Sequence, residues 1–262
     1  MSRLAILPLF LAVFFAPFAG QCQTPKPAWQ TAIEQRRSQL VATYGSGSDA
    51  ELRDQLLQMR DEDQAAQSLH SHPAASEDQA ASSGETLFAS SARHTDELKK
   101  IYEANGWPTI ALVGIDASNA AMLILTHATD LGWRQQILPQ LQELADGGRI
   151  DPSSYALALD KELVAEGKLQ RYGSQFMALG GKIAMYAVED PAHLDDRRAQ
   201  AMLPPIAVTK QQMSTMYGMA VSEDVVMATP AKAAAPAKAA TPAKTATAAK
   251  SAPAKARPKT KK

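Results

Sequence analysis

The sequence has 262 residues, with 27 basic and 27 acidic side chains and therefore a formal net charge of zero. An apolar share of 45% excludes a wholly disordered chain, and a single cysteine excludes an internal disulfide framework or a Cys-rich zinc site. The charge is unevenly distributed, because residues 228–262 contain eight Lys, one Arg and no acidic side chain. Such an asymmetry points to an interaction tail.

The first 22 residues have the pattern of a secretory signal peptide. Arg3 gives a positive start, an almost wholly apolar run follows over 4–18, and small residues come after it. The run is shorter than the roughly 20 residues of a transmembrane helix, so we expect a cleaved signal, with an uncleaved anchor as the alternative. Gln21 disfavours lipidation of Cys22, which is otherwise removed or kept near the mature N-terminus. We therefore predict an exported bacterial protein, periplasmic or envelope-associated, without a transmembrane span in the mature chain.

Residues 23–221 are predicted to form a mainly helical (α+β) domain, a helical bundle with one small β-hairpin. Apolar residues recur at helical spacing over 29–44, and the motif at 48–51 matches a capping box that begins a second helix. That helix is expected to continue to about residue 70. The stretch 71–92 is rich in Ser, Ala, Glu and Gln, and we interpret it as a polar loop.

The middle of the domain is predicted to be helical as well. Asp116 is expected to cap one of its helices, and Asp151 followed by Pro152 is typical of an N-cap with proline at the first helical position. Glycines mark several of the expected ends. The helices are expected over 95–104, 117–130, 133–145 and 152–167.

The periodicity then changes to that of strands. The runs 170–176 and 182–188 flank a Gly-Gly pair, which predicts a β-hairpin. A short helix opens near residue 190, and a last helix is expected over 209–216. Because an isolated hairpin is marginally stable in water, it should pack against the helices.

Residues 228–262 form the predicted C-terminal tail. They repeat a Pro-Ala-Lys theme and contain no large apolar residue, so we expect a disordered, low-complexity segment. The tail carries +9 and residues 1–227 carry −9. After export, the expected partners of the tail are anionic envelope polymers rather than nucleic acid, although the charge alone gives no specificity. A solubilising linker without a specific partner is the alternative, and the acidic body is a further candidate.

Short motifs recur in a fixed order over most of the predicted domain. The main ones are Met59-Arg60-Asp61-Glu62-Asp63-Gln64, Gly106-Trp107-Pro108, His127-Ala128, Gln170-x-Tyr172-Gly173-Ser174-Gln175, and Asp196-Arg197-Arg198-Ala199 with Leu203-Pro204-Pro205. In this combination the chain resembles the bacterial DUF6624 proteins, a domain of unknown function, over about 52–217. It departs from them in Ser174, where the family usually has Thr, and in a longer insert at 71–92. The resemblance implies a domain boundary and no particular activity.

Two titratable side chains are predicted to lie on the apolar faces of their helices. His127 follows Ile124 by three residues, and Asp63 follows Met59 by four. A buried histidine is either a general base with a shifted pKa or a core residue bonded to a carboxylate or carbonyl. An inward carboxylate needs a partner. The candidate partners for Asp63 are Arg60, Arg197, Arg198 and His127.

Polar side chains in the predicted hairpin suit a polar ligand such as a sugar or peptide. Gln170, Tyr172 and Ser174 would share one face of the first strand, with Gln175 on the other. The alternative is that these groups satisfy the hairpin edge and nearby helix ends. Residues 195–198 are expected to form a solvated, salt-bridged face. The candidate ligand-binding residues are Arg60, Gln64, Gln170, Tyr172, Gln175 and Arg197.

The sequence lacks the standard catalytic motifs. It has no nucleophile elbow, no zinc-protease motif, no phosphate-binding loop and no dinucleotide fingerprint, so we predict no cofactor and no metal. We expect an envelope binding or interaction module whose tail associates with anionic polymers. The alternative is an envelope hydrolase or transferase in which His127 is the general base and Asp63 orients it.

Overall fold

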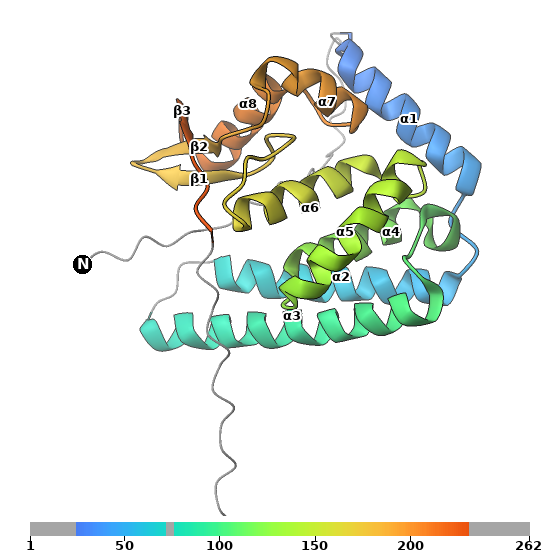
Figure 1. The fold of residues 1–262 in the computed structure, drawn as a ribbon. Coiled ribbons are helices and arrows are strands. Elements are labelled where there is room, and N and C mark those ends of the chain that lie inside the picture. Colours follow the sequence, from blue (N-terminus) through green and yellow to red (C-terminus); the bar gives the residue numbers. More distant parts are fainter. Residues whose placement is uncertain (1–24, 72–75, 231–262) are drawn as a thin grey trace, which may run out of the picture. The chain divides into compact units, whose positions relative to one another are not determined.

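The computed structural model describes residues 25–71 and 76–230. The predicted signal peptide and residues 231–262 of the predicted tail lie outside this part of the chain. Within the described ranges the chain forms eight α-helices, one short 3-10 helix and a three-stranded sheet (Figure 1). The predicted mainly helical class with a small β element is confirmed.

One helix, α4, lies at the centre of the helical part. It packs against α1, α2, α3 and α6. The neighbouring helices α2 and α3 form the long side-by-side pair in Figure 1. The helices are α1 (Ala28–Tyr44), α2 (Ala50–Ser71), α3 (Glu77–Asn105), α4 (Ile110–His127), α5 (Leu131–Asp146), α6 (Pro152–Ala165), η1 (Pro191–His193), α7 (Leu194–Gln200) and α8 (Ile206–Tyr217).

The apolar character of α4 explains its central place. Its mean hydropathy of 1.4 over 18 residues would suffice for a membrane span, yet 67% of that stretch is buried inside the protein. Burial of this kind is expected of a core helix. Its side chains pack with Leu56 of α2, Leu98 of α3 and Leu141 of α5 in the main hydrophobic core.

A close backbone contact joins the α1–α2 loop to a kink in α4. Gly114 at the kink has a φ of +77°, which side chains rarely adopt. A Cβ at Gly114 would lie 2.8 Å from the carbonyl oxygen of Ser46, and one at Gly47 would lie 2.5 Å from the Gly114 nitrogen. Both positions therefore require glycine.

The sheet has the order β1-β2-β3 and its own small core. The strands are β1 (Phe176–Leu179), β2 (Lys182–Tyr186) and β3 (Val221–Val226). β1 pairs antiparallel with β2 across the Gly-Gly turn, as predicted, whereas β3 pairs parallel with β2 and was not predicted. The hairpin packs against α7 and α8 through a second cluster that includes Phe176, Ile183, Met185, Leu194 and Met213.

The prediction of a polar loop over 71–92 was wrong for most of that stretch. α3 begins at Glu77 and continues without a break to Asn105. The Ser76 side chain accepts a hydrogen bond from the Gln79 N–H and caps the helix. Ala, Glu and Gln are strong helix formers, so the polar composition marks a largely exposed helix rather than a loop.

Two predicted caps had different outcomes. Asp151 does cap α6, because its carboxylate accepts from the Ser153 N–H and Pro152 is the first helical residue. Asp116 is no cap. It lies inside α4, which begins at Ile110 and contains the Gly114 kink, and it forms an exposed ion pair with Arg37.

Residues 171–175 form a loop before β1 and not a strand, contrary to the prediction, whereas Gln170 forms an isolated parallel bridge with Val188. In the loop, a fully buried carboxylate, that of Asp160 in α6, takes the place of strand pairing. It accepts hydrogen bonds from the backbone N–H groups of Arg171, Tyr172 and Ser174 at 2.7 to 3.2 Å. Three backbone donors are thereby satisfied away from water.

Arg198 holds the same loop from α7. Its side chain is 2% exposed, which corrects the prediction of a solvated face at this position. The guanidinium donates to the carbonyls of Tyr172 and Pro204 and to the hydroxyl of Thr209. Burial lowers the pKa of Arg198 to about 10. The loop is therefore fixed to α6 on one side and to α7 and α8 on the other.

Replacing Asp160 with Asn tests this arrangement. The amide would turn an NH₂ group toward backbone donors, so we expect the free energy of unfolding to fall by about 1–3 kcal/mol. Urea denaturation followed by circular dichroism measures the change. Asp54→Asn, at an aspartate whose side chain is 72% exposed, should alter stability by less than about 0.5 kcal/mol. An unchanged Asp160→Asn midpoint would contradict the assigned role.

Candidate functional site

Asp63 and His127, the two predicted inward-facing residues, meet in the structure. His127 is the last residue of α4, and its Nδ1 lies 2.7 Å from Oδ2 of Asp63 on α2. The side chains of His127 and Asp63 are 4% and 1% exposed. When Nδ1 carries the ring proton and donates it to the carboxylate, Nε2 carries the lone pair. The pair thus has the geometry of a carboxylate-oriented imidazole.

The surroundings keep His127 neutral. Burial is the main cause that lowers its pKa below the ordinary 6.5, and the hydrogen bond that the ring donates to Asp63 opposes this effect. The positive charges of Lys161 and Arg134 lower the pKa further. The imidazole is therefore in its basic form at neutral pH.

Lys161 on α6 is the second titratable group beside His127, and it is not one of the residues predicted from the sequence. Its Nζ donates to the carbonyl oxygen of Thr126, one residue before His127. Burial, assisted by the charge of Arg134, lowers the pKa of Lys161 to about 7. An amine with such a pKa exchanges protons near neutrality.

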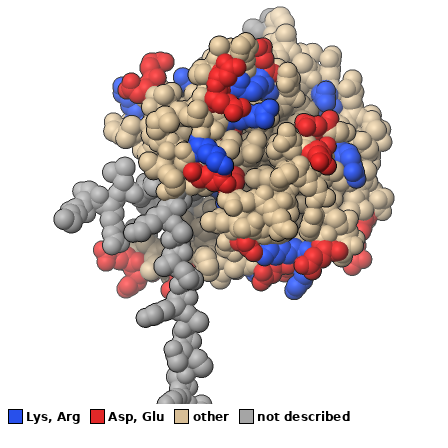
Figure 2. Space-filling view, in the orientation of Figure 1, with Lys and Arg blue, Asp and Glu red and all other residues tan. Residues whose placement is uncertain are grey.

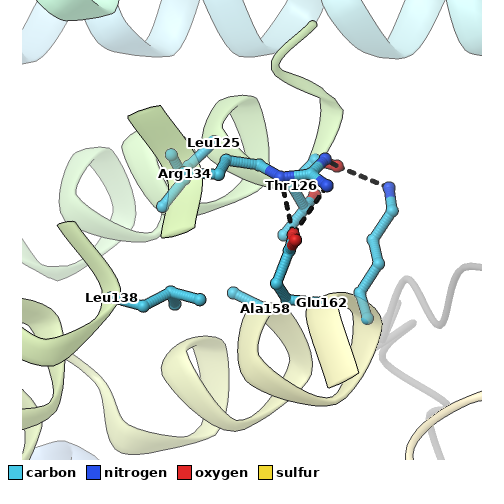
Figure 3. A pocket seen from close by; sticks show the side chains of 7 residues that line it. Leu125, Thr126, Arg134, Leu138, Ala158 and Glu162 are labelled. Atoms are coloured by element: carbon cyan, nitrogen blue, oxygen red, sulfur yellow. Dashed lines mark hydrogen bonds and ion pairs between the residues drawn. The ribbon is translucent and has the colours of Figure 1, made fainter. Parts of the chain in front are cut away.

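A buried ion pair between α5 and α6 completes the group. Nη2 of Arg134 lies 2.6 Å from Oε2 of Glu162, and both side chains are at most 10% exposed. Figure 3 shows Arg134 and Glu162 reaching toward each other beside Thr126. Nη1 of Arg134 also donates to the carbonyls of Thr126 and Ala128 at 3.4 Å. A space of about 10 Å³, roughly one water molecule, lies next to this pair.

The contacts of Arg134 and Lys161 satisfy the C-terminal end of α4. The last carbonyl groups of α4 have no partner within the helix, and the C-terminal end carries a partial negative charge. Lys161 and Arg134 supply the donors and the positive charge at this end. The same two cations therefore stabilise α4 and set the electrostatics around His127.

The cations and His127 line one cavity of about 340 Å³. His70, Phe88 and Ser91 also line it, and among the described residues that line the cavity none carries a carboxylate. Asp63 is not a lining residue and lies behind the imidazole. Elsewhere in the described ranges, no three His, Cys, Asp or Glu side chains come together as metal ligands. The cavity thus favours a neutral or anionic group.

The other predicted ligand-binding residues do not line this cavity. Gln64 contacts the dyad, since its Nε2 donates to Oδ2 of Asp63 at 3.2 Å, whereas Arg60 pairs with Asp61 at the surface. Tyr172 and Arg197 line a second cavity of about 200 Å³. The dyad is therefore formed from two of the eight predicted site residues, and a third contacts it.

The predicted glutamines of the 170–175 loop serve the backbone of that loop. Gln170 is fully buried, and its amide donates to the carbonyls of Gln175 and Tyr186 and accepts from the Gln175 N–H. The Gln175 side chain donates to the Ser174 hydroxyl. The hydrogen bonds of Gln170 agree with the alternative interpretation, in which the polar side chains bond to neighbouring backbone groups instead of a ligand.

A sequence signal exists for one of the missed residues, Glu162. Tyr155, Ala158 and Glu162 follow one another at helical spacing and are all buried. A carboxylate on such an apolar stripe has to find a cation. The rule that selected Asp63 would also have selected Glu162, but it cannot show that Arg134 comes from another helix.

Comparison with known proteins places the domain in a family. The model of DUF6624, described as a family of unknown function, matches residues 50–222 and so covers both members of the dyad, Lys161 and the Arg134–Glu162 pair. No curated protein and no solved structure matches the chain. Because the match covers well over half of the sequence, the chain belongs to the DUF6624 family.

Proposed function

We propose that the folded domain is a hydrolase or transferase that uses His127 as general base on a carbonyl or phosphoryl substrate. The observation that carries the proposal is the 2.7 Å contact between Asp63 and His127 in the wall of a cavity that also contains Lys161 and Arg134. General bases act best when their pKa lies near the working pH. Lys161, with a pKa of about 7, meets that condition, and the pKa of His127 is lowered, mainly by burial, which favours the neutral base.

Each residue of the site has a separate role in the proposed reaction. Asp63 fixes the imidazole orientation and its Nδ1–H tautomer. Nε2 of His127 is buried in the structure, so it has to become accessible to the substrate before it acts. It then removes a proton from water or from a substrate hydroxyl while that oxygen attacks the electrophilic atom, and Asp63 stabilises the resulting imidazolium. The negative charge that develops on the attacked group faces protonated Lys161 and Arg134. The proton returns from His127 to the leaving group.

The other residues that line the cavity indicate the class of substrate. Leu87 and Phe88 of α3 line the cavity, and the Phe88 side chain is largely exposed. Ser91, Thr126 and Thr129 add polar groups. This combination suits a substrate with an anionic or neutral polar reacting group next to an apolar part.

The proposal predicts a narrow, bell-shaped dependence of kcat/KM on pH. Activity should rise as His127 loses its proton, with a midpoint below the ordinary histidine value of 6.5. It should fall again as Lys161 loses its proton near pH 7. Lys161→Arg keeps the positive charge at all these pH values and should remove the alkaline fall. A profile that is the same in the Lys161→Arg variant would contradict the role given to Lys161.

Activity against a panel of aryl esters, amides and phosphoesters tests His127 itself. His127→Gln should lower kcat/KM by roughly 10²–10⁴-fold, as expected for loss of a general base. The matched control is His193→Gln, because His193 also contacts an aspartate, Asp190, at 2.7 Å but is 67% exposed and outside the cavity. Asp63→Asn serves as a second variant in case His127→Gln does not fold. Equal loss in the His193→Gln and His127→Gln proteins, or no loss in any variant, would overturn the proposal.

We also propose that the protein is exported and that its basic tail associates with anionic envelope polymers. Support comes from the signal-like segment at 1–22 and from the +9 charge of residues 228–262. On the face of the folded domain shown in Figure 2, acidic and basic side chains are interspersed. Because residues 1–227 carry a net charge of −9, attraction to polyanions would come from the tail, through release of counterions.

A protein that ends at residue 227 tests the role of the tail. We expect the full-length protein to bind anionic lipid vesicles or lipopolysaccharide at low salt and to be released as salt rises, whereas the truncated protein should bind weakly at every salt concentration. Co-sedimentation measures both. Equal sedimentation of the two proteins would show that the tail does not tether the domain.

A further inference from the structure

A second cavity, of about 200 Å³, lies apart from the site of the dyad and shares no lining residue with it. It is bordered by α1, α5, α6, α7 and the loop before β1. The residues that matter for its chemistry are Arg36, Asp146, Tyr155, Arg171, Tyr172 and Arg197. Arg36 belongs to α1, which precedes the part of the chain matched by the family model.

The Tyr155 hydroxyl is a polar group that opens on this cavity. The residue as a whole is 4% exposed and lines the cavity, and no hydrogen bond joins its hydroxyl to another described residue. The oxygen is not one of the fully buried unpartnered atoms of the described chain, so it can be reached from the cavity by water or by a ligand. Burial also raises the pKa of Tyr155 to about 12, so the phenol remains a neutral donor. Tyr172 presents a second phenol, and burial raises its pKa too.

The lining itself carries more positive than negative charge. Three arginines and one carboxylate, that of Asp146, line the cavity, and two of the arginines also contact carboxylates outside it: Arg197 lies 3.7 Å from Asp190 and Arg171 lies near Glu189. Arg197 is held in place, because its guanidinium donates to the carbonyls of Arg171 and Glu189. Arg171 is only loosely engaged: its Nε is 3.6 Å from a Glu189 oxygen and has no hydrogen-bond partner in the described part of the chain.

The geometry also fixes where Arg171 and Tyr172 lie. Their backbone N–H groups are bound to the buried Asp160 carboxylate, and the Arg171 guanidinium lies 5.9 Å from the centre of the Tyr172 ring. A guanidinium and a phenol are thus presented side by side on a fixed loop. Such preorganisation lowers the cost of binding a small ligand.

We propose that this cavity binds a small organic carboxylate that also carries hydroxyl groups, of the kind found in sugar acids and hydroxy acids. The Arg36 and Arg171 guanidiniums match a carboxylate. The two phenols, with the amides of Gln142 and Gln200 at the rim, match hydroxyl groups, and Asp146 accepts from one of them. The volume is below the roughly 300–1,000 Å³ of pockets for drug-sized molecules, so the ligand is a single small unit. This proposal stands independently of the proposed catalysis by His127.

Isothermal titration calorimetry with the full-length protein tests it. The probes are D-gluconate, D-galacturonate and L-lactate, with D-glucose as a neutral control and inorganic phosphate as a second type of anion. We expect saturable binding of at least one carboxylate at millimolar concentration and none of D-glucose. Tyr155→Phe and Arg171→Gln should each weaken that binding by about tenfold or more.

Matched variants separate a binding effect from a folding effect. Tyr217→Phe removes a partly buried phenol that packs on the sheet cluster and does not line this cavity, and it should bind like the wild type. Arg36→Gln changes an exposed residue of α1, so it should weaken binding without changing the unfolding midpoint. The proposal is overturned if none of the three carboxylates binds, if D-glucose binds equally well, or if only phosphate binds. Unchanged affinity in the Tyr155, Arg171 and Arg36 variants would also overturn it.

Discussion

The carboxyl end of α4 is the constraint on which the site depends. An apolar helix at the centre of the fold ends with carbonyl groups that no residue of that helix can satisfy. Arg134 and Lys161 provide the donors, and Glu162 neutralises one of the two cations. His127, the last residue of α4, thereby lies next to two cations and against a buried aspartate. Burial of His127 and Lys161 at this helix end lowers the pKa of both side chains. The chemistry proposed for the cavity therefore depends on the contacts that cap the C-terminal end of α4.

Helix α6 connects the two cavities. Tyr155 lines the second cavity, and Asp160 fixes the loop that supplies Arg171 and Tyr172 to it. The very next residue, Lys161, lines the first cavity with Arg134 as its neighbour. A shift of α6 would therefore alter both sites at once. The buried carboxylate of Asp160 costs stability that its three backbone hydrogen bonds offset, and the result is a loop of fixed shape.

Much of the helical fold followed from local patterns, because caps and apolar stripes are encoded within a few residues. Asp151-Pro152 and the Gly-Gly turn are examples. The 77–92 part of α3 was predicted to be a loop because a largely exposed helix can have the same polar composition as a loop. The strand β3 and the shape of the 170–175 loop depend on partners far away in sequence. The inward orientation of His127 and Asp63 was predictable, but their contact across 64 residues was only one of several alternatives. Lys161 could not be found in this way, since its pKa is lowered by burial in the folded protein and by the charge of Arg134 from α5.

NMR of the protein with isotope-labelled histidine rings tests directly whether His127 is a neutral base oriented by Asp63. The ring nitrogen shifts report the pKa and the tautomer of each histidine. We predict that His127 titrates below the ordinary value of 6.5 and carries its neutral-state proton on Nδ1. A His127 that titrates above 6.5, or whose neutral form carries the proton on Nε2, would contradict it.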